Sequence, residues 1–175
     1  ARLAPSTVLP PRDITLITPE TPTTELIAEG TFANLGVADD LVAILNERGI
    51  EAPFPIQALT IPDALAGRDV TGKAKTGSGK TLAFGLPIVQ SITKAAKGKP
   101  QALVLVPTRE LAAQVAESVA AYGAHLPSRS AVIFGGVKIN PQIATLRRGV
   151  EILIATPGRL LDHVQQRTLD LSRIE

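Results

Sequence analysis

The sequence predicts an α/β fold in which helices cover a parallel sheet. Short runs of β-branched and other apolar residues alternate with longer segments whose apolar residues recur at three- or four-residue spacing. Two of the short runs, Ala102–Val106 and Ile152–Ala155, are continuously apolar, as strands buried on both faces of a parallel sheet are. The chain has 175 residues, of which 45% are apolar and 19% charged, so we expect one globular domain.

The elements follow one another in a regular order. Residues 1–30 carry several prolines and threonines without a helical or strand period, so we expect a flexible lead-in there and a domain over residues 31–175. Four strands are expected, at Asp69–Thr71, Ala102–Val106, Ala131–Phe134 and Ile152–Ala155. Six helical patterns fill the intervals, at Asp39–Arg48, Ile56–Ala66, Lys80–Thr93, Arg109–Gly123, Pro141–Arg148 and Gly158–Arg167.

Composition excludes several functional classes. Without Cys, the chain has no disulfide framework, thiol chemistry or Cys-based zinc site. It has no apolar run of about 18 residues and no signal-peptide pattern, so we expect a cytoplasmic protein with no membrane partner. The net charge of +2 does not by itself indicate nucleic acid. Because the chain begins at Ala1 and contains no Met, we expect it to be a fragment of a longer protein.

A glycine-rich segment between a strand and a helix predicts a phosphate-binding loop. Gly77 and Gly79 permit backbone angles that turn successive N–H groups toward phosphate oxygens. Lys80 adds a positive charge at the β- and γ-phosphates, and the Thr81 hydroxyl is a candidate Mg²⁺ ligand. The strand and helix on either side argue against a simple Gly/Ser linker. The loop residues are Ala74, Lys75, Thr76, Gly77, Ser78, Gly79, Lys80 and Thr81.

Two further helix starts follow strands directly. Thr108 and Thr156 are candidate N-caps, and Pro157 occupies the first helical position, which tolerates proline. The carboxyl ends of parallel strands share one edge of a sheet, so these helix starts should lie near the phosphate loop. Such features are also ordinary in α/β proteins, but their common edge favours phosphates of an extended polyanion. The candidate contacts are Pro107, Thr108, Arg109, Gly135, Gly136, Thr156, Pro157, Gly158 and Arg159. His125 and His163 have no metal-ligand partners at useful spacing and are expected to be structural or surface residues.

Together these motifs resemble the first RecA-like domain of the DEAD-box RNA helicases, a P-loop NTPase fold. The resemblance covers about residues 32–175 and implies ATP and Mg²⁺ as cofactors and RNA as a partner bound without sequence preference. It implies that Lys80 and Thr81 act in catalysis, and that the contacts at the two further helix starts and at Gly135 and Gly136 belong to RNA. The segment Gly49–Gln57 resembles the family's Q motif, which implies that Gln57 hydrogen-bonds adenine and that Phe32 packs against the base.

The sequence departs from the family in several respects. Phe54 stands where the Q motif usually has Ser or Thr, and the chain contains neither an Asp-Glu-Ala-Asp nor a Ser-Ala-Thr segment, nor a second RecA-like domain. We therefore expect an incomplete sheet, and negligible ATP hydrolysis by these residues alone. The leading hypothesis is that the parent protein is an ATP-dependent RNA helicase. The alternatives are a non-catalytic ATP- or RNA-binding module and another P-loop ATPase such as a DNA translocase.

Overall fold

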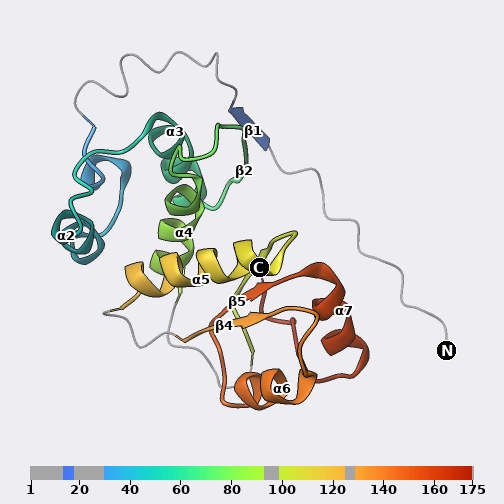
Figure 1. The fold of residues 1–175 in the computed structure, drawn as a ribbon. Coiled ribbons are helices and arrows are strands. Elements are labelled where there is room, and N and C mark those ends of the chain that lie inside the picture. Colours follow the sequence, from blue (N-terminus) through green and yellow to red (C-terminus); the bar gives the residue numbers. More distant parts are fainter. Residues whose placement is uncertain (1–13, 18–29, 93–98, 125–128, 175) are drawn as a thin grey trace.

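The computed structural model of the chain describes residues 14–17, 30–92, 99–124 and 129–174 (Figure 1). The strands are β1 (Ile14–Ile17), β2 (Asp69–Gly72), β3 (Ala102–Leu105), β4 (Ser130–Ile133) and β5 (Ile152–Ala155). The helices are η1 (Ala33–Leu35), α2 (Asp39–Glu47), α3 (Pro55–Leu65), α4 (Lys80–Ser91), α5 (Arg109–Tyr122), α6 (Ile139–Arg147) and α7 (Pro157–Gln165). The ten elements expected from the sequence are all present, each within two residues at either end, which confirms the α/β fold.

The strands form two parallel sheets, whereas the sequence predicted one. β1 pairs with β2, and β3, β5 and β4 form a second sheet with β5 in the middle. In the described part of the chain no ladder joins β2 to β3, and a groove of about 590 Å³ lies between them. Side chains of β3, such as Leu103, and of α3, such as Ile56, line this groove. Strand periodicity identifies strands but not their neighbours, so the division was not visible in the sequence.

Strand β1 lies inside the segment that was expected to be a lead-in without strands. Its four residues pair in register with β2, from Ile14 opposite Asp69 to Ile17 opposite Gly72. The expectation is therefore wrong for these residues, while residues 1–13 and 18–29 lie outside the described part of the chain. The run is as long as the other strands, but the prolines around it are typical of loops, so it did not stand out. Pairing with β2 supplies the hydrogen bonds that local sequence cannot specify.

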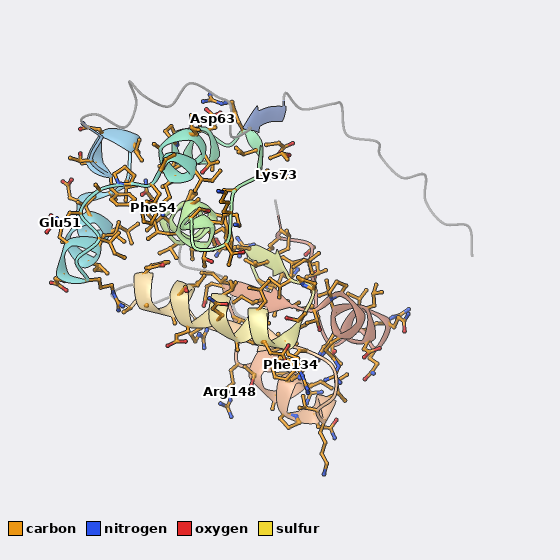
Figure 2. All side chains as sticks on the ribbon, turned by 45° about the horizontal axis from the view of Figure 1, so that its top comes forward. Glu51, Phe54, Asp63, Lys73, Phe134 and Arg148 are labelled. Carbon is orange, nitrogen blue, oxygen red and sulfur yellow. The ribbon has the colours of Figure 1, made fainter. Side chains whose placement is uncertain are left out.

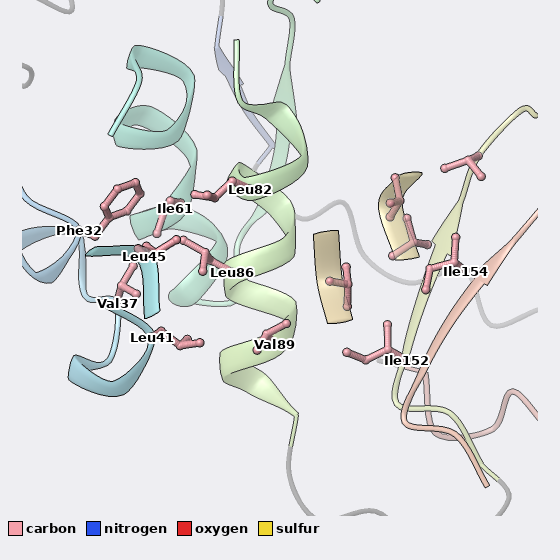
Figure 3. Packing of buried hydrophobic residues seen from close by; sticks show 14 of the residues in the cluster. Phe32, Val37, Leu41, Leu45, Ile61, Leu82, Leu86, Val89, Ile152 and Ile154 are labelled. Atoms are coloured by element: carbon pink, nitrogen blue, oxygen red, sulfur yellow. The ribbon is translucent and has the colours of Figure 1, made fainter. Parts of the chain in front are cut away.

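Helix α4 occupies the centre of the core. It packs against α3 and α5, and its Leu86 and Val89 belong to an apolar cluster that also contains Phe32 from the N-terminal side and Ile154 from β5 (Figure 3). Because this cluster includes residues next to both sheets, it joins the two halves of the domain. Burial of its apolar surface contributes roughly 25 cal/mol per Å² to folding.

Strand β5 is buried on both faces, as its continuous apolar sequence predicted. Ile152 and Ile154 face the cluster around α4, whereas Leu153 and Ala155 belong to a second cluster with residues of α6 and α7. Strand β3 differs, because its Leu105 is 53% exposed. An edge strand has a neighbour on one side only, and the open groove lies on the other side of β3.

Among the described residues, no helix combines the length and the apolar character needed to cross a bilayer.

Candidate functional site

The predicted phosphate loop connects β2 to α4, in the expected strand–loop–helix order. Gly77 and Gly79 have φ angles of 82° and 80°, in the left-handed region that favours glycine. Gly79 is also the N-cap of α4, so the loop leads directly into the amino end of that helix. A Cβ atom at Gly79 would overlap the side-chain amide of Gln57 and lie 2.9 Å from Phe54 Cδ2. Both the backbone angle and the close approach of α3 therefore require glycine here.

Lys80 hydrogen-bonds to the backbone of the phosphate loop. Its ammonium donates hydrogen bonds to the carbonyl oxygens of Ala74 and Lys75, each at 2.7 Å. These contacts hold the first half of the loop against the first residue of α4. The positive charge therefore lies within the loop, where the sequence predicted that it would meet phosphate.

Two further observations show that the loop fits a phosphate ligand. The Ser78 hydroxyl is buried and has no hydrogen-bond partner in the described structure, as expected for a polar atom that a ligand satisfies. Thr81, the second residue of α4, is half-buried beside Lys80. The described residues contain no group of three or more His, Cys, Asp or Glu side chains that could hold a metal.

Gln57 links α3 to the phosphate loop. Its Oε1 accepts a hydrogen bond from the Phe54 backbone N–H at 2.8 Å, and its Nε2 donates to the Gly79 carbonyl at 3.1 Å. The side chain is 2% exposed. Sequence reasoning expected this amide to bind adenine, but in the structure both of its ends are used within the protein. One N–H and one oxygen lone pair of the amide are unused by these two bonds, and the hydrogen bond with adenine stays a prediction.

The aromatic residues Phe32 and Phe54 differ in exposure, and the contact of Phe32 with a base stays a prediction. Phe32 is 1% exposed and belongs to the apolar cluster around α4 (Figure 3), because a ring without a polar atom is most stable there. It therefore presents no free face to a base in this structure. Phe54, which directly precedes α3 and is labelled in Figure 2, is 55% exposed, and its Cδ2 lies 2.9 Å from the position that a Cβ atom on Gly79 would take.

A second site region forms at the carboxyl ends of β3, β4 and β5. The Arg109 guanidinium lies against Gly136, with Nη1 3.1 Å from the position that a Cβ atom would take. Arg159 Nη2 donates a hydrogen bond of 2.9 Å to the Val137 carbonyl. The structure therefore brings together the segments after these three strands, as the sequence predicted from their common edge.

The helix starts in this region have the predicted form. The Thr108 hydroxyl accepts a hydrogen bond of 3.2 Å from the Leu111 backbone N–H and so caps α5. Thr156 occupies the N-cap position of α7 and is followed by Pro157 at the first helical position, but its side chain makes no capping hydrogen bond. Of the nine candidate RNA contacts, those exposed at the surface are Pro107, Thr108, Arg109, Gly136, Pro157 and Gly158.

Arg159 is buried, unlike Arg109. Only 9% of it is exposed, and its Nε lies 3.3 Å from Asp162 Oδ2. Its Nη1 is buried and has no hydrogen-bond partner in the described structure. Through the Val137 carbonyl this side chain supports the loop that contains Gly135 and Gly136. Its direct contact with RNA remains a prediction.

A buried polar network that sequence reasoning missed supports the same loop. Gln142 Nε2 donates to the Phe134 carbonyl at 3.0 Å, so its Oε1 faces His163 Nε2 at 3.2 Å. Because Oε1 can only accept, His163 carries its proton on Nε2. Its Nδ1 lies 2.8 Å from Thr168 Oγ1, whose one hydrogen is shared between this nitrogen and the His163 carbonyl, 3.1 Å away. The signal was a polar residue on an apolar helix stripe: Gln142 lies four residues before the buried Leu146.

Burial keeps His163 neutral. The ring is fully buried, and its loss of hydration lowers the pKa of His163 below the usual value, with a smaller contribution from the Arg159 charge. The expectation of a structural histidine is confirmed, since both ring nitrogens face hydrogen-bond partners. His125 lies outside the described residues.

Comparisons with known proteins point to one family. The DEAD/DEAH box helicase family matches residues 54–175. The chain is 50% identical over 147 residues to the ATP-dependent RNA helicase DeaD of Escherichia coli K12, covering 83% of this chain and 23% of that protein. It is 46% identical over 145 residues to the DEAD-box ATP-dependent RNA helicase CshA of Bacillus cereus, covering 27% of that protein. The chain therefore spans about a quarter of the length of the curated relatives it matches.

Two solved structures share the fold. A DEAD box protein from the hyperthermophile Methanococcus jannaschii superposes with a TM-score of 0.77 at 34% identity, over 83% of this chain and 39% of that one. The RNA helicase Prp28 from Chaetomium thermophilum, bound to ADP, superposes with a TM-score of 0.76 at 38% identity, over 83% of this chain and 37% of that one.

Proposed function

Because the chain belongs to the DEAD/DEAH box helicase family, we propose that it provides the ATP-binding loop and part of the RNA-binding surface of an ATP-dependent RNA helicase. The observation that carries the proposal is a preformed phosphate loop in the same domain as an edge where Arg109, Gly136 and Arg159 converge. The relatives that match are named for this activity.

In the proposed site, the loop holds the nucleotide phosphates. Backbone N–H groups of the loop and of the first turn of α4 face the phosphates, and the unpaired Ser78 hydroxyl gains a partner. Lys80 transfers hydrogen bonds from the Ala74 and Lys75 carbonyls to phosphate oxygens. Thr81 ligates Mg²⁺, which would neutralise part of the phosphate charge.

Calorimetric titration with Mg–ATP tests this part of the proposal. Wild-type protein should bind ATP, and Lys80→Ala should bind it much more weakly because the positive charge is lost. Arg147→Ala is the matched control, since Arg147 is an exposed cation on α6. The nucleotide assignment is refuted if the Lys80→Ala and wild-type proteins bind ATP equally well.

RNA is proposed to lie along the carboxyl ends of β3, β4 and β5. Arg109 offers an exposed guanidinium, and the missing side chain of Gly136 leaves the space in which that guanidinium lies. Contacts to phosphate carry no sequence information, so we infer that binding is independent of sequence.

Arg109→Ala should weaken binding of a single-stranded RNA oligonucleotide and lower the salt dependence of log K by roughly one unit. Equal losses in Arg109→Ala and Arg147→Ala would contradict the assignment, and competition with DNA of the same sequence tests the preference for RNA.

A non-catalytic binding module is the second candidate, and it concerns a polypeptide of these 175 residues alone. The sequence contains no Asp-Glu-Ala-Asp segment, although phosphoryl transfer needs a metal held by acidic residues and an oriented water. We therefore expect a polypeptide of these 175 residues to bind ATP but to hydrolyse it negligibly. Rapid RNA-stimulated turnover by that polypeptide, abolished by Lys80→Ala, would refute this expectation. A cytoplasmic location remains a prediction from composition.

A further inference from the structure

The β4–α6 loop, residues 134–138, is held at two backbone carbonyls by buried side chains. The carbonyl of Phe134, which Figure 2 labels, accepts a hydrogen bond of 3.0 Å from Gln142 Nε2. The carbonyl of Val137 accepts one of 2.9 Å from Arg159 Nη2. Gln142 belongs to α6 and Arg159 to α7, and each is 9% exposed. The two glycines that are proposed to contact RNA lie between these carbonyls, so both ends of the glycine pair are fixed from within the protein.

The position of this loop also sets the position of a proposed phosphate contact. Gly136 is exposed, and its missing side chain leaves the space in which the Arg109 guanidinium lies. No described atom lies within 4 Å of the position that a Cβ atom on Gly135 would take. The hydrogen bonds to the two carbonyls therefore fix the loop without covering its glycines. A shift of the loop would move both the glycines and the support of Arg109.

His163 determines which end of the Gln142 amide faces the loop. Its Nε2 lies 3.2 Å from Gln142 Oε1. In the opposite orientation of the amide, Oε1 would face the Phe134 carbonyl oxygen, and two acceptors form no hydrogen bond. A proton on His163 Nε2 donates to Oε1, so it stabilises the orientation in which the amide N–H donates to Phe134.

We propose that Gln142 and His163 are positioning residues for RNA binding: His163 orients the Gln142 amide, and the amide holds the β4–α6 loop in the conformation that binds the RNA backbone. This inference rests on the proposed function, because it takes this loop to be part of the RNA-binding surface. His163 is fully buried and acts on RNA through Gln142 and the loop. A loop that is ordered before binding loses less conformational freedom when RNA binds, so its affinity is higher.

A purely structural role is the alternative, because buried polar side chains with satisfied hydrogen bonds also stabilise a domain. The two roles affect different quantities. A structural role changes the free energy of unfolding, whereas a positioning role changes the RNA affinity of the folded protein. The phosphate loop follows β2, which belongs to the other sheet, so a positioning role should leave ATP affinity unchanged.

RNA and ATP binding by variants of the full-length protein test the proposal. Gln142→Glu keeps the length of the side chain and an acceptor for His163, but its carboxylate cannot donate to Phe134. Gln142→Met removes both hydrogen bonds without adding a charge. Leu146→Ala is the matched control, since it destabilises the same helix by shortening a buried apolar residue and removes no hydrogen bond of the loop.

Both Gln142 variants should bind a single-stranded RNA oligonucleotide roughly tenfold more weakly than the wild type, the loss expected for about one hydrogen bond. They should bind ATP like the wild type, and Leu146→Ala should change neither affinity. Fluorescence anisotropy measures RNA binding and calorimetry measures ATP binding, at a temperature at which circular dichroism shows every variant folded. The imidazole ¹⁵N chemical shifts of wild-type His163 should show the proton on Nε2.

The outcomes separate this inference from the proposed function. RNA binding by Gln142→Met at the wild-type level would refute the positioning role, as would an equal loss of RNA affinity in Leu146→Ala. Equal losses of RNA and ATP affinity in the Gln142 variants would indicate a structural role instead. A His163 proton on Nδ1 would refute its part in orienting the amide. If the wild type binds no RNA, or if Arg109→Ala binds RNA as tightly as the wild type, the proposed RNA surface itself fails.

Discussion

Two independent features of the structure require glycine at position 79. Its φ angle is positive, and its missing side chain leaves the space that the Gln57 amide occupies. Gly77 has a similar φ angle, but nothing lies within 4 Å of a Cβ atom placed on it. The two glycines therefore share the strained backbone angle and differ in the close contact, so a comparison of their alanine variants isolates the contact.

Alanine at each glycine should separate the two constraints. Gly77→Ala should lower the unfolding free energy by about 1 kcal/mol, because alanine is strained in the left-handed backbone conformation. Gly79→Ala should cost more, because Gln57 must move and lose hydrogen bonds worth about 1 kcal/mol each. Urea denaturation measures both values. Equal destabilisation of the two variants would show that the contact between α3 and the loop adds nothing.

His163 should make stability depend on pH. Its pKa is lowered in the folded protein, so below the ordinary histidine pKa of about 6.5 the unfolded chain binds more protons than the folded one. Stability is therefore expected to fall as pH decreases from 7 through this value. His163→Gln, which cannot titrate, should show a weaker fall between pH 7 and 5. Thermal unfolding of both proteins across this range measures the difference, and parallel curves would contradict it.

The chemistry of single residues was partly visible in the sequence. The spacing of Gly77, Gly79 and Lys80 predicted the phosphate loop, and Thr108 was correctly expected to cap a helix. The burial of Gln57 was not foreseen, because the partner that buries it, Gly79, lies 22 positions away. A residue type indicates which hydrogen bonds a side chain can make, but packing decides which partner it meets.

Among the helices, α5 and α7 begin in similar ways but with different capping. Thr108 caps α5 through its hydroxyl, whereas Thr156 precedes α7 without a side-chain hydrogen bond. Thr108→Ala should therefore lower the unfolding free energy by about 1 kcal/mol. Thr156→Ala should lower the unfolding free energy by less, because the Thr156 side chain makes no capping hydrogen bond. Chemical denaturation of both variants measures the two unfolding free energies. A larger loss of unfolding free energy in Thr156→Ala than in Thr108→Ala would contradict the prediction.

Apolar periodicity located the helices, and short apolar runs located four of the strands. Helix α5, for example, has 14 residues and several apolar positions on one stripe. Strand β1 is as long as the other strands but lies among prolines, which are typical of loops, so its sequence did not distinguish it. The separation of β2 from β3 depends on ladder hydrogen bonds between distant segments, which no local pattern encodes.

The two sheets of the whole molecule are joined through one apolar cluster around α4. Leu86 is 1% exposed within it. Leu86→Ala should cost about 2–5 kcal/mol through lost burial and the cavity that remains. Because the cluster reaches both halves, amide hydrogen exchange should accelerate in β2 and β5 together. Faster exchange confined to β2 would show that the halves unfold separately.

The internal bonds of Lys80 also affect which anions the loop accepts. Its ammonium already satisfies the Ala74 and Lys75 carbonyls, so an incoming anion has to draw it away from both. Electrostatic attraction grows with the charge of the anion. Chloride, with one diffuse charge, competes poorly with two carbonyls, whereas a triphosphate competes well. In the proposed site, the loop would thus favour triphosphates over small anions through the phosphates alone.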